Sequence, residues 1–386
     1  MSKKICVVVN SRANYGRIKS FMRAVQEHPE LELQLIVGAS ALLFRFGNVI
    51  DNIRLDGFEP TAIVYSIVEG ENLTTMAKST GLGIIELASL FEQMQPDFVL
   101  TVADRFETLA TAVAASYMNI PVVHTQGGEV SGSIDESVRH AITKLSHIHF
   151  PATEKARDIL LRMGEDPNSV YVTGCPAMDI LAESDLTLSP DLFEKNLGVG
   201  EVIDPGVPYV VVLQHPVTTE FGEGADQINH TLVAVNQLKM QAVWLWPNVD
   251  AGSDSISKQL RTFHEHNPSA PISFHRNFSV EDYARLINNA ACVIGNSSSG
   301  IRECAFLGIP AVNIGSRQAL RETGPNVLHA PYDSDEIYQT VQKQLQSERF
   351  KRSNLFGNGT AGKQMADVLA ATSDVSLQKR LWYSDV

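Results

Sequence analysis

The sequence has few cysteines, and the four present are scattered. Cys6, Cys175, Cys292 and Cys304 form no C-x-x-C pair. Structural zinc sites and disulfide frameworks require clustered or regularly spaced cysteines, so neither is expected. Close histidine pairs at 147/149 and 264/266 have no evident third ligand, and we predict no metal site. Isolated free cysteines fit a reducing compartment, and we predict a cytoplasmic location.

The chain also lacks long apolar runs and a net positive charge. Two lysines precede only five apolar residues, 5–9, which is too few for a signal peptide. No stretch approaches the roughly 18 apolar residues of a membrane span. The 31 Lys and Arg residues against 44 Asp and Glu residues give a net charge of −13. Because such a chain repels nucleic acid and anionic membranes, we expect neither as a partner.

Two common nucleotide-binding signatures are missing as well. Residues 9–16, after the first apolar run, read VNSRANYG and contain no G-x-G-x-x-G. This weakens a dinucleotide interpretation. No G-x-x-x-x-G-K-[ST] occurs, so a P-loop nucleotide hydrolase is not expected.

What the sequence does contain is a regular alternation of strand and helix patterns. Hydrophobic residues make up 44% of the 386, enough for a core of ordinary size. Buried-strand runs are predicted at 5–9, 33–37, 98–102, 121–124, 147–150, 209–213, 242–246, 292–294 and 311–314. Helical patterns are predicted at 15–27, 72–94, 105–118, 153–163, 225–240, 253–266, 279–289, 299–307, 334–347 and 362–371. The alternation predicts two α/β halves with parallel sheets, and the proline-containing segment 175–208 is expected to hold the hinge.

The segment 294–303, IGNSSSGIRE, is the first candidate site. A buried strand ends there in small polar residues, and a helix is expected to begin. Ser297, Ser298 and the flexible Gly300 could bind a phosphate with hydroxyls and backbone N–H groups. Glu303 could accept hydrogen bonds from a ribose. The alternative is an ordinary serine N-cap with a favourably placed glutamate, and spacing alone does not separate the two.

Two further strand ends carry polar residues. In open α/β sheets, ligands bind beyond the carboxyl ends of the strands. His215 follows one strand and could donate a proton or a hydrogen bond to a departing phosphate, or it could be a plain loop histidine. Asp104 and Arg105 follow another strand. Asp104 could point a carboxylate into a cleft, although capping the next helix is the simpler explanation.

A glycine-containing loop at 124–132, HTQGGEVSG, supplies more carboxylates. Glu129, Asp135 and Glu136 could perform acid–base work, or they could be a solvated charge cluster. Arg12 and Arg317, each after a predicted strand, could pair with a diphosphate through the planar guanidinium. Taken singly, each is more often a surface ion-pair partner.

The segments are more specific together than apart. SRAxY at 11–15, DR at 104–105, GGE at 127–129, RH at 139–140, QHP at 214–216, PNxDAG at 247–252 and GNSSxG at 295–300 occur in one order. Over residues 4–370 the chain resembles the hydrolysing UDP-N-acetylglucosamine 2-epimerases, which include bacterial sialic-acid-pathway enzymes and the epimerase half of the bifunctional animal enzyme.

The resemblance implies two Rossmann-like domains of the glycosyltransferase-B-like kind, with the active site in the interdomain cleft. The implied domains are 1–175 for the sugar and catalysis, 176–360 for UDP, and a C-terminal helix in 361–386 that returns to the first domain. The implied reaction converts UDP-N-acetylglucosamine and water into N-acetylmannosamine and UDP, without a cofactor. A homodimer or homotetramer is also implied.

The resemblance also assigns roles by position. The UDP ligands it implies are Arg12, Arg105, His215, Asn248, Ser297, Ser298, Gly300, Glu303 and Arg317. The implied or candidate catalytic residues are Asp104, Glu129, Asp135 and His215. Two positions depart from the family pattern: Gln126 stands where many relatives have a catalytic glutamate, and Asn14 replaces a frequent acidic residue. Because an amide cannot act as a base, that role must pass to Glu129, Asp104 or Asp135.

Four alternatives stay open. The chain could be a member of the family that acts on UDP-2,4-diacetamido-2,4,6-trideoxyglucose, on the route to legionaminic acid. A non-hydrolysing epimerase would return UDP-N-acetylmannosamine. From other classes, the chain could be a UDP-sugar-binding module without turnover or a glycosyltransferase, because this architecture hosts several activities.

Overall fold

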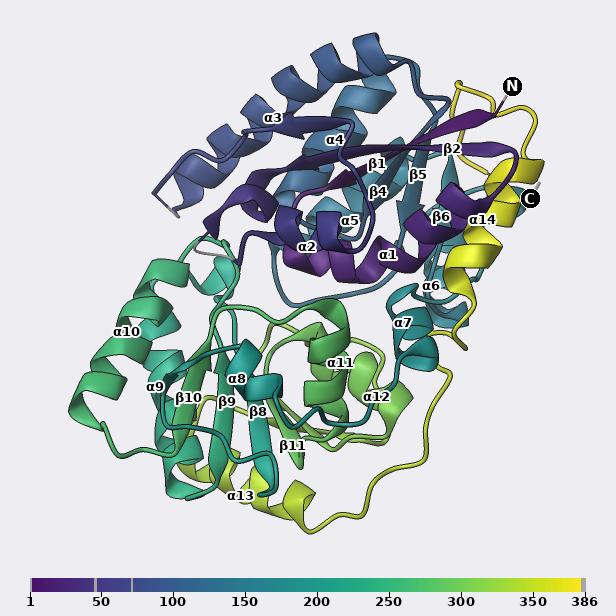
Figure 1. Ribbon diagram of the computed structural model, residues 1–386. Helices are drawn as coiled ribbons and strands as arrows, with labels where there is room; N and C mark the ends of the chain where they lie inside the picture. Colours follow the sequence, from purple (N-terminus) through teal and green to yellow (C-terminus); the bar gives the residue numbers. More distant parts are fainter. Residues whose placement is uncertain (1, 45–46, 71, 383–386) are drawn as a thin grey trace.

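The computed structural model describes residues 2–44, 47–70 and 72–382, and these form two α/β halves (Figure 1). In the first half, six parallel strands lie in the order β3-β2-β1-β4-β5-β6. Their bounds are β1 Lys3–Val9, β2 Leu31–Gly38, β3 Ala62–Val64, β4 Phe98–Val102, β5 Val122–Thr125 and β6 Ile148–Phe150. These β-branched, buried runs have helices on both faces, as a parallel sheet requires.

Two apolar clusters, one on each face of this sheet, form the core of the first half. One cluster includes side chains of α3 (Leu73–Met94), α4 (Phe106–Tyr117) and α5 (Ile134–Leu145). The other includes side chains of α1 (Arg12–Glu27), α2 (Val49–Leu55) and α14 (Ala361–Ala371). The C-terminal helix therefore packs against the first half, beside α1 (Figure 1).

The second half repeats the plan. Its sheet has the order β13-β12-β11-β8-β9-β10-β7, and only β7 runs antiparallel. The strands are β7 Val199–Gly200, β8 Tyr209–Leu213, β9 Gln241–Leu245, β10 Ile272–His275, β11 Cys292–Gly295, β12 Ala311–Ile314 and β13 Val327–Ala330. The helices in its two core clusters are α9 Gly224–Gln237, α10 Ser253–His266 and α13 Ser334–Leu345, and α7 Ala177–Glu183, α8 Leu192–Lys195, α11 Val280–Asn288 and α12 Glu303–Leu307.

Both sheets therefore have one topological switch point, where the strand order reverses. It lies between β1 and β4 in the first sheet and between β8 and β11 in the second. A crevice opens at the carboxyl ends of strands at such a point. The polar segments identified in the sequence follow these four strands, so the topology explains why they gather.

The chain crosses between the halves twice, and the crossings lie side by side. The Cys175 N–H donates to the Phe356 carbonyl at 2.7 Å. Gly174 and Gly357 both have positive φ angles, and a Cβ on Gly174 would lie 2.5 Å from the Gly357 Cα. The close approach of two backbones explains the two glycines. The exact boundaries of the predicted segments 1–175, 176–360 and 361–386 stay predictions, and residues 1, 45–46, 71 and 383–386 lie outside the described residues.

Several local predictions need correction. The helix expected at 299–307 is split into a 3₁₀ turn, Ser298–Gly300, and the short α12. Glu303 therefore begins α12 and does not lie one turn inside a longer helix. Strands β3, β7, β10 and β13 and helices α2, α7 and α8 were not predicted, because short runs carry weak periodicity. The amphipathic α5, with 12 residues, was not predicted either. No helix within the described ranges has the length and apolar character needed to cross a bilayer.

Candidate active site

A cleft lies between the two halves. Its lining comes from α1 and the loop after β4 on one side, and from the loops after β8, β9, β10, β11 and β12 with parts of α7, α11 and α12 on the other. The predicted site residues that line it are Arg12, Asp104, Arg105, His215, Asn248, Ser297, Ser298, Glu303 and Arg317. Glu129, Asp135 and Gly300 are not part of this lining. The structure thus brings together nine of the twelve predicted residues.

On the second-sheet side, His215 is fixed by an amide clamp. The His215 backbone N–H donates to Asn296 Oδ1 at 2.7 Å, and Asn296 Nδ2 donates to the His215 carbonyl at 2.8 Å. This joins the ends of β8 and β11 across the switch point. The Asn248 N–H donates to His215 Nδ1 at 3.2 Å, so the ring proton of a neutral imidazole lies on Nε2.

The His215 ring is neutral in this cleft. Burial lowers its pKa well below 6.5, and the charges of Arg317 and Arg12 lower it further. A neutral ring can donate a hydrogen bond from Nε2 but carries no extra proton to give away. The neutral ring therefore does not favour the expectation that His215 supplies a proton near neutral pH. It does favour the expected hydrogen bond to a phosphate.

The serine turn after β11 presents hydroxyls to the cleft. The Ser297 side chain caps the turn by accepting from the Ser299 N–H at 3.3 Å. Ser298 Oγ accepts from Arg17 at 2.5 Å, and Ser299 Oγ accepts from Tyr283 at 2.6 Å. Gly300 faces away from the cleft, toward Ala311 and Val293. Its predicted contact with UDP stays a prediction that the cleft lining does not support, because the 3₁₀ turn directs it toward the sheet interior.

Glu303 contributes an unused acceptor. Its Oε2 is buried and has no hydrogen-bond partner among the described residues. A buried carboxylate oxygen without a partner costs free energy. A ligand hydroxyl at this wall of the cleft would satisfy it.

Four arginines line the cleft: Arg12, Arg17, Arg105 and Arg317. Arg105 is held by Asp250 at 2.8 Å and Glu107 at 3.1 Å, and Arg317 lies 3.6 Å from Asp135 and 3.9 Å from Asp250. Arg12 and Arg17 have no carboxylate within 4.0 Å in the described part of the chain. They are the cations best placed to meet an anion.

Arg17, Tyr283 and Asn296 were not predicted as site residues. A signal for Arg17 existed, since Arg12, Ala13, Gly16 and Arg17 have the spacing of one helix face. Asn296 lies within the candidate segment 294–303, but its clamp on His215, 81 positions away, gave no signal, and Tyr283 gave none either.

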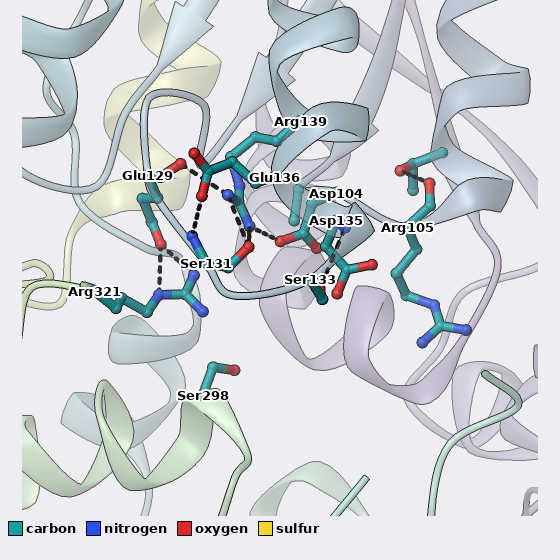
Figure 2. A network of polar contacts seen from close by, with 12 residues as sticks. Asp104, Arg105, Glu129, Ser131, Ser133, Asp135, Glu136, Arg139, Ser298 and Arg321 are labelled. Carbon is teal, nitrogen blue, oxygen red and sulfur yellow. Dashed lines mark hydrogen bonds and ion pairs between the residues drawn. The ribbon is translucent and has the colours of Figure 1, made fainter. Parts of the chain in front are cut away.

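On the first-sheet side, Asp104 is held ionised. Burial would raise its pKa, but the guanidiniums of Arg139 and Arg17 hold it below its ordinary value. Arg139, fully buried, donates to Asp104 (Figure 2). Asp104 does not cap α4, whose N-cap is Arg105 without a side-chain hydrogen bond, so the simpler explanation of this aspartate was wrong.

The backbone before Asp104 is strained and supported. Ala103 has φ 62°, an unusual value for a residue with a Cβ. Its carbonyl accepts from His124 Nε2 at 2.8 Å, and burial lowers the pKa of His124 to about 3. A neutral, fully buried histidine thus fixes the turn that directs Asp104 into the cleft. Strain of this kind often accompanies functional sites.

Asp135, near the start of α5, lies beside Asp104 (Figure 2). Burial and the neighbouring Asp104 charge together raise its pKa to about 6, against the pull of Arg317. Two neighbouring carboxylates whose pKa values are driven apart can hold one proton between them near neutral pH. Asp135 does not line the cleft itself. It lies beside Asp104 and 3.6 Å from Arg317, and both of these residues line the cleft.

Glu129 has a different environment from the one expected. Its carboxylate accepts from Arg321 (Figure 2) and from Arg302, both in the second half of the chain. Burial would raise the pKa of Glu129, but the two arginines lower it to about 2. In this structure it bridges the halves as an ion pair behind the cleft, so its position does not support the expected role as the base.

The two departures from the family pattern lie away from the cleft lining. Gln126 is buried and donates to Cys175 Sγ at 3.3 Å. Asn14 is buried in the first turn of α1, where its Oδ1 accepts from the Asn10 N–H at 3.3 Å. In the described residues, no group of three or more His, Cys, Asp or Glu side chains is arranged to hold a metal ion.

Comparison with known proteins agrees with this geometry. Residues 23–370 match the family model described as UDP-N-acetylglucosamine 2-epimerase. A "UDP-N,N'-diacetylbacillosamine 2-epimerase (hydrolyzing)" of Legionella pneumophila is 33% identical over 369 residues, 96% of each chain. A UDP-N-acetylglucosamine 2-epimerase of Neisseria meningitidis is 30% identical over 383 residues, 98% of each chain.

Solved structures show the same fold. The UDP-GlcNAc 2-epimerases of Methanocaldococcus jannaschii, in complex with UDP-GlcNAc and UDP, and of Neisseria meningitidis, bound to UDP-GlcNAc, each give a TM-score of 0.77 at 18% identity. The alignments cover 96% of this chain and 100% of those chains. The predicted glycosyltransferase-B-like fold is confirmed, and the chain belongs to the UDP-N-acetylglucosamine 2-epimerase family.

Proposed function

We propose that this protein is a hydrolysing UDP-N-acetylglucosamine 2-epimerase, which produces N-acetylmannosamine and UDP for sialic acid biosynthesis. One observation carries the proposal. An ionised carboxylate, Asp104, lines the same cleft as unpaired guanidiniums and hydroxyl donors. Removal of a C2 proton with departure of UDP needs both kinds of group.

The second-sheet side and α1 suit the nucleotide. Arg12 and Arg17 supply positive charge, and Ser297, Ser298 and His215 supply hydrogen-bond donors for the diphosphate. The unpartnered Oε2 of Glu303 suits a ribose hydroxyl.

The chemistry then follows from the order of bond breaking. The C2 proton is not acidic while UDP remains attached. As the C1–O bond breaks, C1 becomes electron-poor, and Asp104 can take the C2 proton to leave a glycal. Water then adds its hydroxyl to C1, and a proton returns to the opposite face of C2. Asp135, with its raised pKa, is the candidate to hold that proton.

The hydrolysing outcome is supported by relatives. The Legionella protein and a Campylobacter jejuni protein that is 31% identical over 356 residues carry "hydrolyzing" in their names. A non-hydrolysing enzyme would instead return UDP-N-acetylmannosamine. Incubation with UDP-N-acetylglucosamine and separation of the nucleotides distinguishes them: the proposal expects one free UDP for each sugar converted, and intact UDP-N-acetylmannosamine without free UDP would contradict it.

A second candidate substrate is UDP-2,4-diacetamido-2,4,6-trideoxyglucose, on the legionaminic acid route. The 33% identity to the diacetylbacillosamine enzyme, against 30% to the Neisseria enzyme, favours it. Comparison of kcat/KM for the two UDP-sugars decides, and a tenfold or larger preference for the diacetamido sugar would replace the first assignment.

The remaining family properties are proposals of the same kind. We propose a catalytic first domain (1–175), a UDP-binding second domain (176–360) and a homodimer or homotetramer in the cytoplasm. A binding module or a glycosyltransferase is less favoured, because the Asp104–Asp135 pair supplies acid–base groups that binding alone does not need.

A further inference from the structure

The C-terminal segment after α14, residues 372–382, lies against the end of α5 that is remote from the cleft. Lys379 extends its ammonium group to the Thr143 carbonyl at 2.6 Å and also donates to the Ser146 carbonyl. Nζ lies 2.6 Å from Glu165 Oε2. The side chain is 21% exposed, so this is a largely buried cation with three oxygen acceptors.

Two of these acceptors are carbonyls at a helix end, and besides Lys379 the Thr143 carbonyl accepts, among the described residues, only the capping Ser146 N–H, at 3.1 Å. The last carbonyls of a helix have no partner within the helix, and this end carries the negative part of the helix dipole. Thr143 is in the last turn of α5, and Ser146 is its C-cap. A lysine from the C-terminal segment therefore caps α5.

Glu165, after α6 (Glu154–Arg162), adds a second connection to the same helix. Its side chain is 1% exposed and lies 2.6 Å from Lys144 of α5, as well as from Lys379. His149 Nε2 lies 3.0 Å from Glu165 Oε2, the oxygen that Lys379 also contacts. The segment is also held by its backbone, since the Trp382 N–H donates to the Gly164 carbonyl at 2.9 Å.

The opposite end of α5 carries the acid–base groups of the cleft. Asp135 is near its first residue, and Arg139, one turn later, donates to Asp104. Twelve helical residues span about 18 Å at 1.5 Å per residue, and a helix transmits an axial shift along its length. The position of α5 therefore sets the separation of Asp135 from Asp104.

We propose that Lys379 is a positioning residue for the reaction: by capping α5 from the C-terminal segment, it fixes the helix that holds Asp135 and Arg139 against Asp104. The proposal rests on the proposed function, in which Asp104 and Asp135 move the C2 proton. It assigns the C-terminal segment a role in the chemistry beyond the packing of α14.

Lys379→Met tests the proposal, because it keeps the aliphatic length and removes the charge and the donors. Lys363→Met, at a lysine of α14 that is 78% exposed, is the matched control, and Lys379→Arg is the conservative rescue. Two readouts need no turnover: hydrogen exchange of the α5 amides, and the pKa of Asp135 from a carboxyl ¹³C titration assigned with Asp135→Asn. The third readout is the dependence of kcat and KM on pH.

In Lys379→Met we expect faster exchange in α5 and a fall in the Asp135 pKa by half a unit or more, as the repulsion from Asp104 weakens. We also expect a roughly tenfold lower kcat with little change in KM, and Lys379→Arg and Lys363→Met near wild type. A lower melting temperature with unchanged Asp135 pKa and pH profile would show a merely structural lysine and overturn the proposal. If Lys379→Met does not fold, Lys379→Gln, which retains a donor, takes its place with the same expectations. A wild-type protein that releases no UDP would refute the proposed function, while the exchange and pKa readouts still decide the role of Lys379.

Discussion

The two sheets end at the same cleft with the same topology, yet they contribute different chemistry. At the first switch point, Asp104 and Asp135 are carboxyl groups with interdependent pKa values, and Arg139 donates to Asp104. At the second, the groups are a neutral imidazole, an amide and hydroxyls, held largely by backbone hydrogen bonds.

This difference separates proton transfer from recognition. A neutral, hydrogen-bonded edge can bind the same anion over a wide pH range, whereas a coupled pair of carboxylates responds to pH. Topology fixes where a ligand can bind, and the side chains at each edge decide what happens there. The predictions below test this division.

Asp104→Asn should have the largest effect. The amide keeps the shape but cannot take a proton, so we expect kcat to fall by about 10³, within the range for loss of a general base. Nucleotide binding should change little, because the UDP-directed groups are elsewhere. Steady-state release of UDP and calorimetric UDP binding measure both, with the surface variant Asp158→Asn as control. Turnover within tenfold of wild type would remove Asp104 from the mechanism.

Glu129→Gln tests whether Glu129 is a structural ion-pair partner, in contrast to Asp104, which we propose to be the base. It leaves Arg302 and Arg321 without their buried carboxylate partner, so we expect a loss of about 3–5 kcal/mol in the free energy of unfolding. Chemical denaturation measures it. A variant that is as stable as wild type but has no turnover would make Glu129 a candidate base again.

His215→Ala should lower UDP release by about 10², the usual loss for one donor to a developing charge. Because the pKa of the ring is well below 6.5, the wild-type pH profile should show no step that disappears in this variant. Such a step near pH 6.5 would mean that His215 acts as a proton donor, and near-wild-type turnover would remove it from the site.

Asp135→Asn tests the other half of the carboxylate pair through stability. The folded-state pKa is raised from 3.8 to about 6, so the folded protein binds more protons than the unfolded one in this window. The contribution of Asp135 to stability is full below pH 4 and is lost as the pH rises through 6. The asparagine variant should gain up to about 3 kcal/mol relative to wild type between pH 4 and 7, at about 1.4 kcal/mol per pKa unit. If the difference in the free energy of unfolding between the two proteins does not change with pH, the raised pKa is excluded.

Glu303→Gln should have the smallest effect. One acceptor for a ribose hydroxyl is lost, and we expect a roughly tenfold weaker affinity for UDP with kcat nearly unchanged, in line with about 1.4 kcal/mol for one hydrogen bond to a charged group. Calorimetry with UDP and with the 2′-deoxy nucleotide measures it: if the carboxylate binds the 2′-hydroxyl, the variant should no longer distinguish the two.

The sequence predicted nine of the residues that line the cleft. Most of them follow a buried strand or begin the first helix, and such positions are local features, whereas Asn248 was assigned through the family resemblance. The sequence could not predict the state of those residues. The charge of Asp104 depends on Arg139, 35 positions away, and the fate of Glu129 depends on Arg302 and Arg321, more than 170 positions away. Periodicity carries no information on such pairs.

The weakest structural predictions failed for a related reason. Strand β10, Ile272–His275, has four residues between polar segments, and α5 begins inside a loop rich in glycine and serine. The strand is stabilised by its neighbours in the sheet more than by its own pattern, whereas α5 has an N-cap serine and an amphipathic pattern of its own. Gly300 looked like a ligand contact because of its sequence neighbours, and the 3₁₀ turn places it against the sheet.

The most direct test of the account is incubation with UDP-N-acetylglucosamine in deuterated water. Removal of the C2 proton, return of a solvent proton and release of UDP predict free UDP together with N-acetylmannosamine that carries one deuterium at C2. Free UDP with a sugar that retains its original hydrogen at C2 would contradict proton transfer by the Asp104–Asp135 pair.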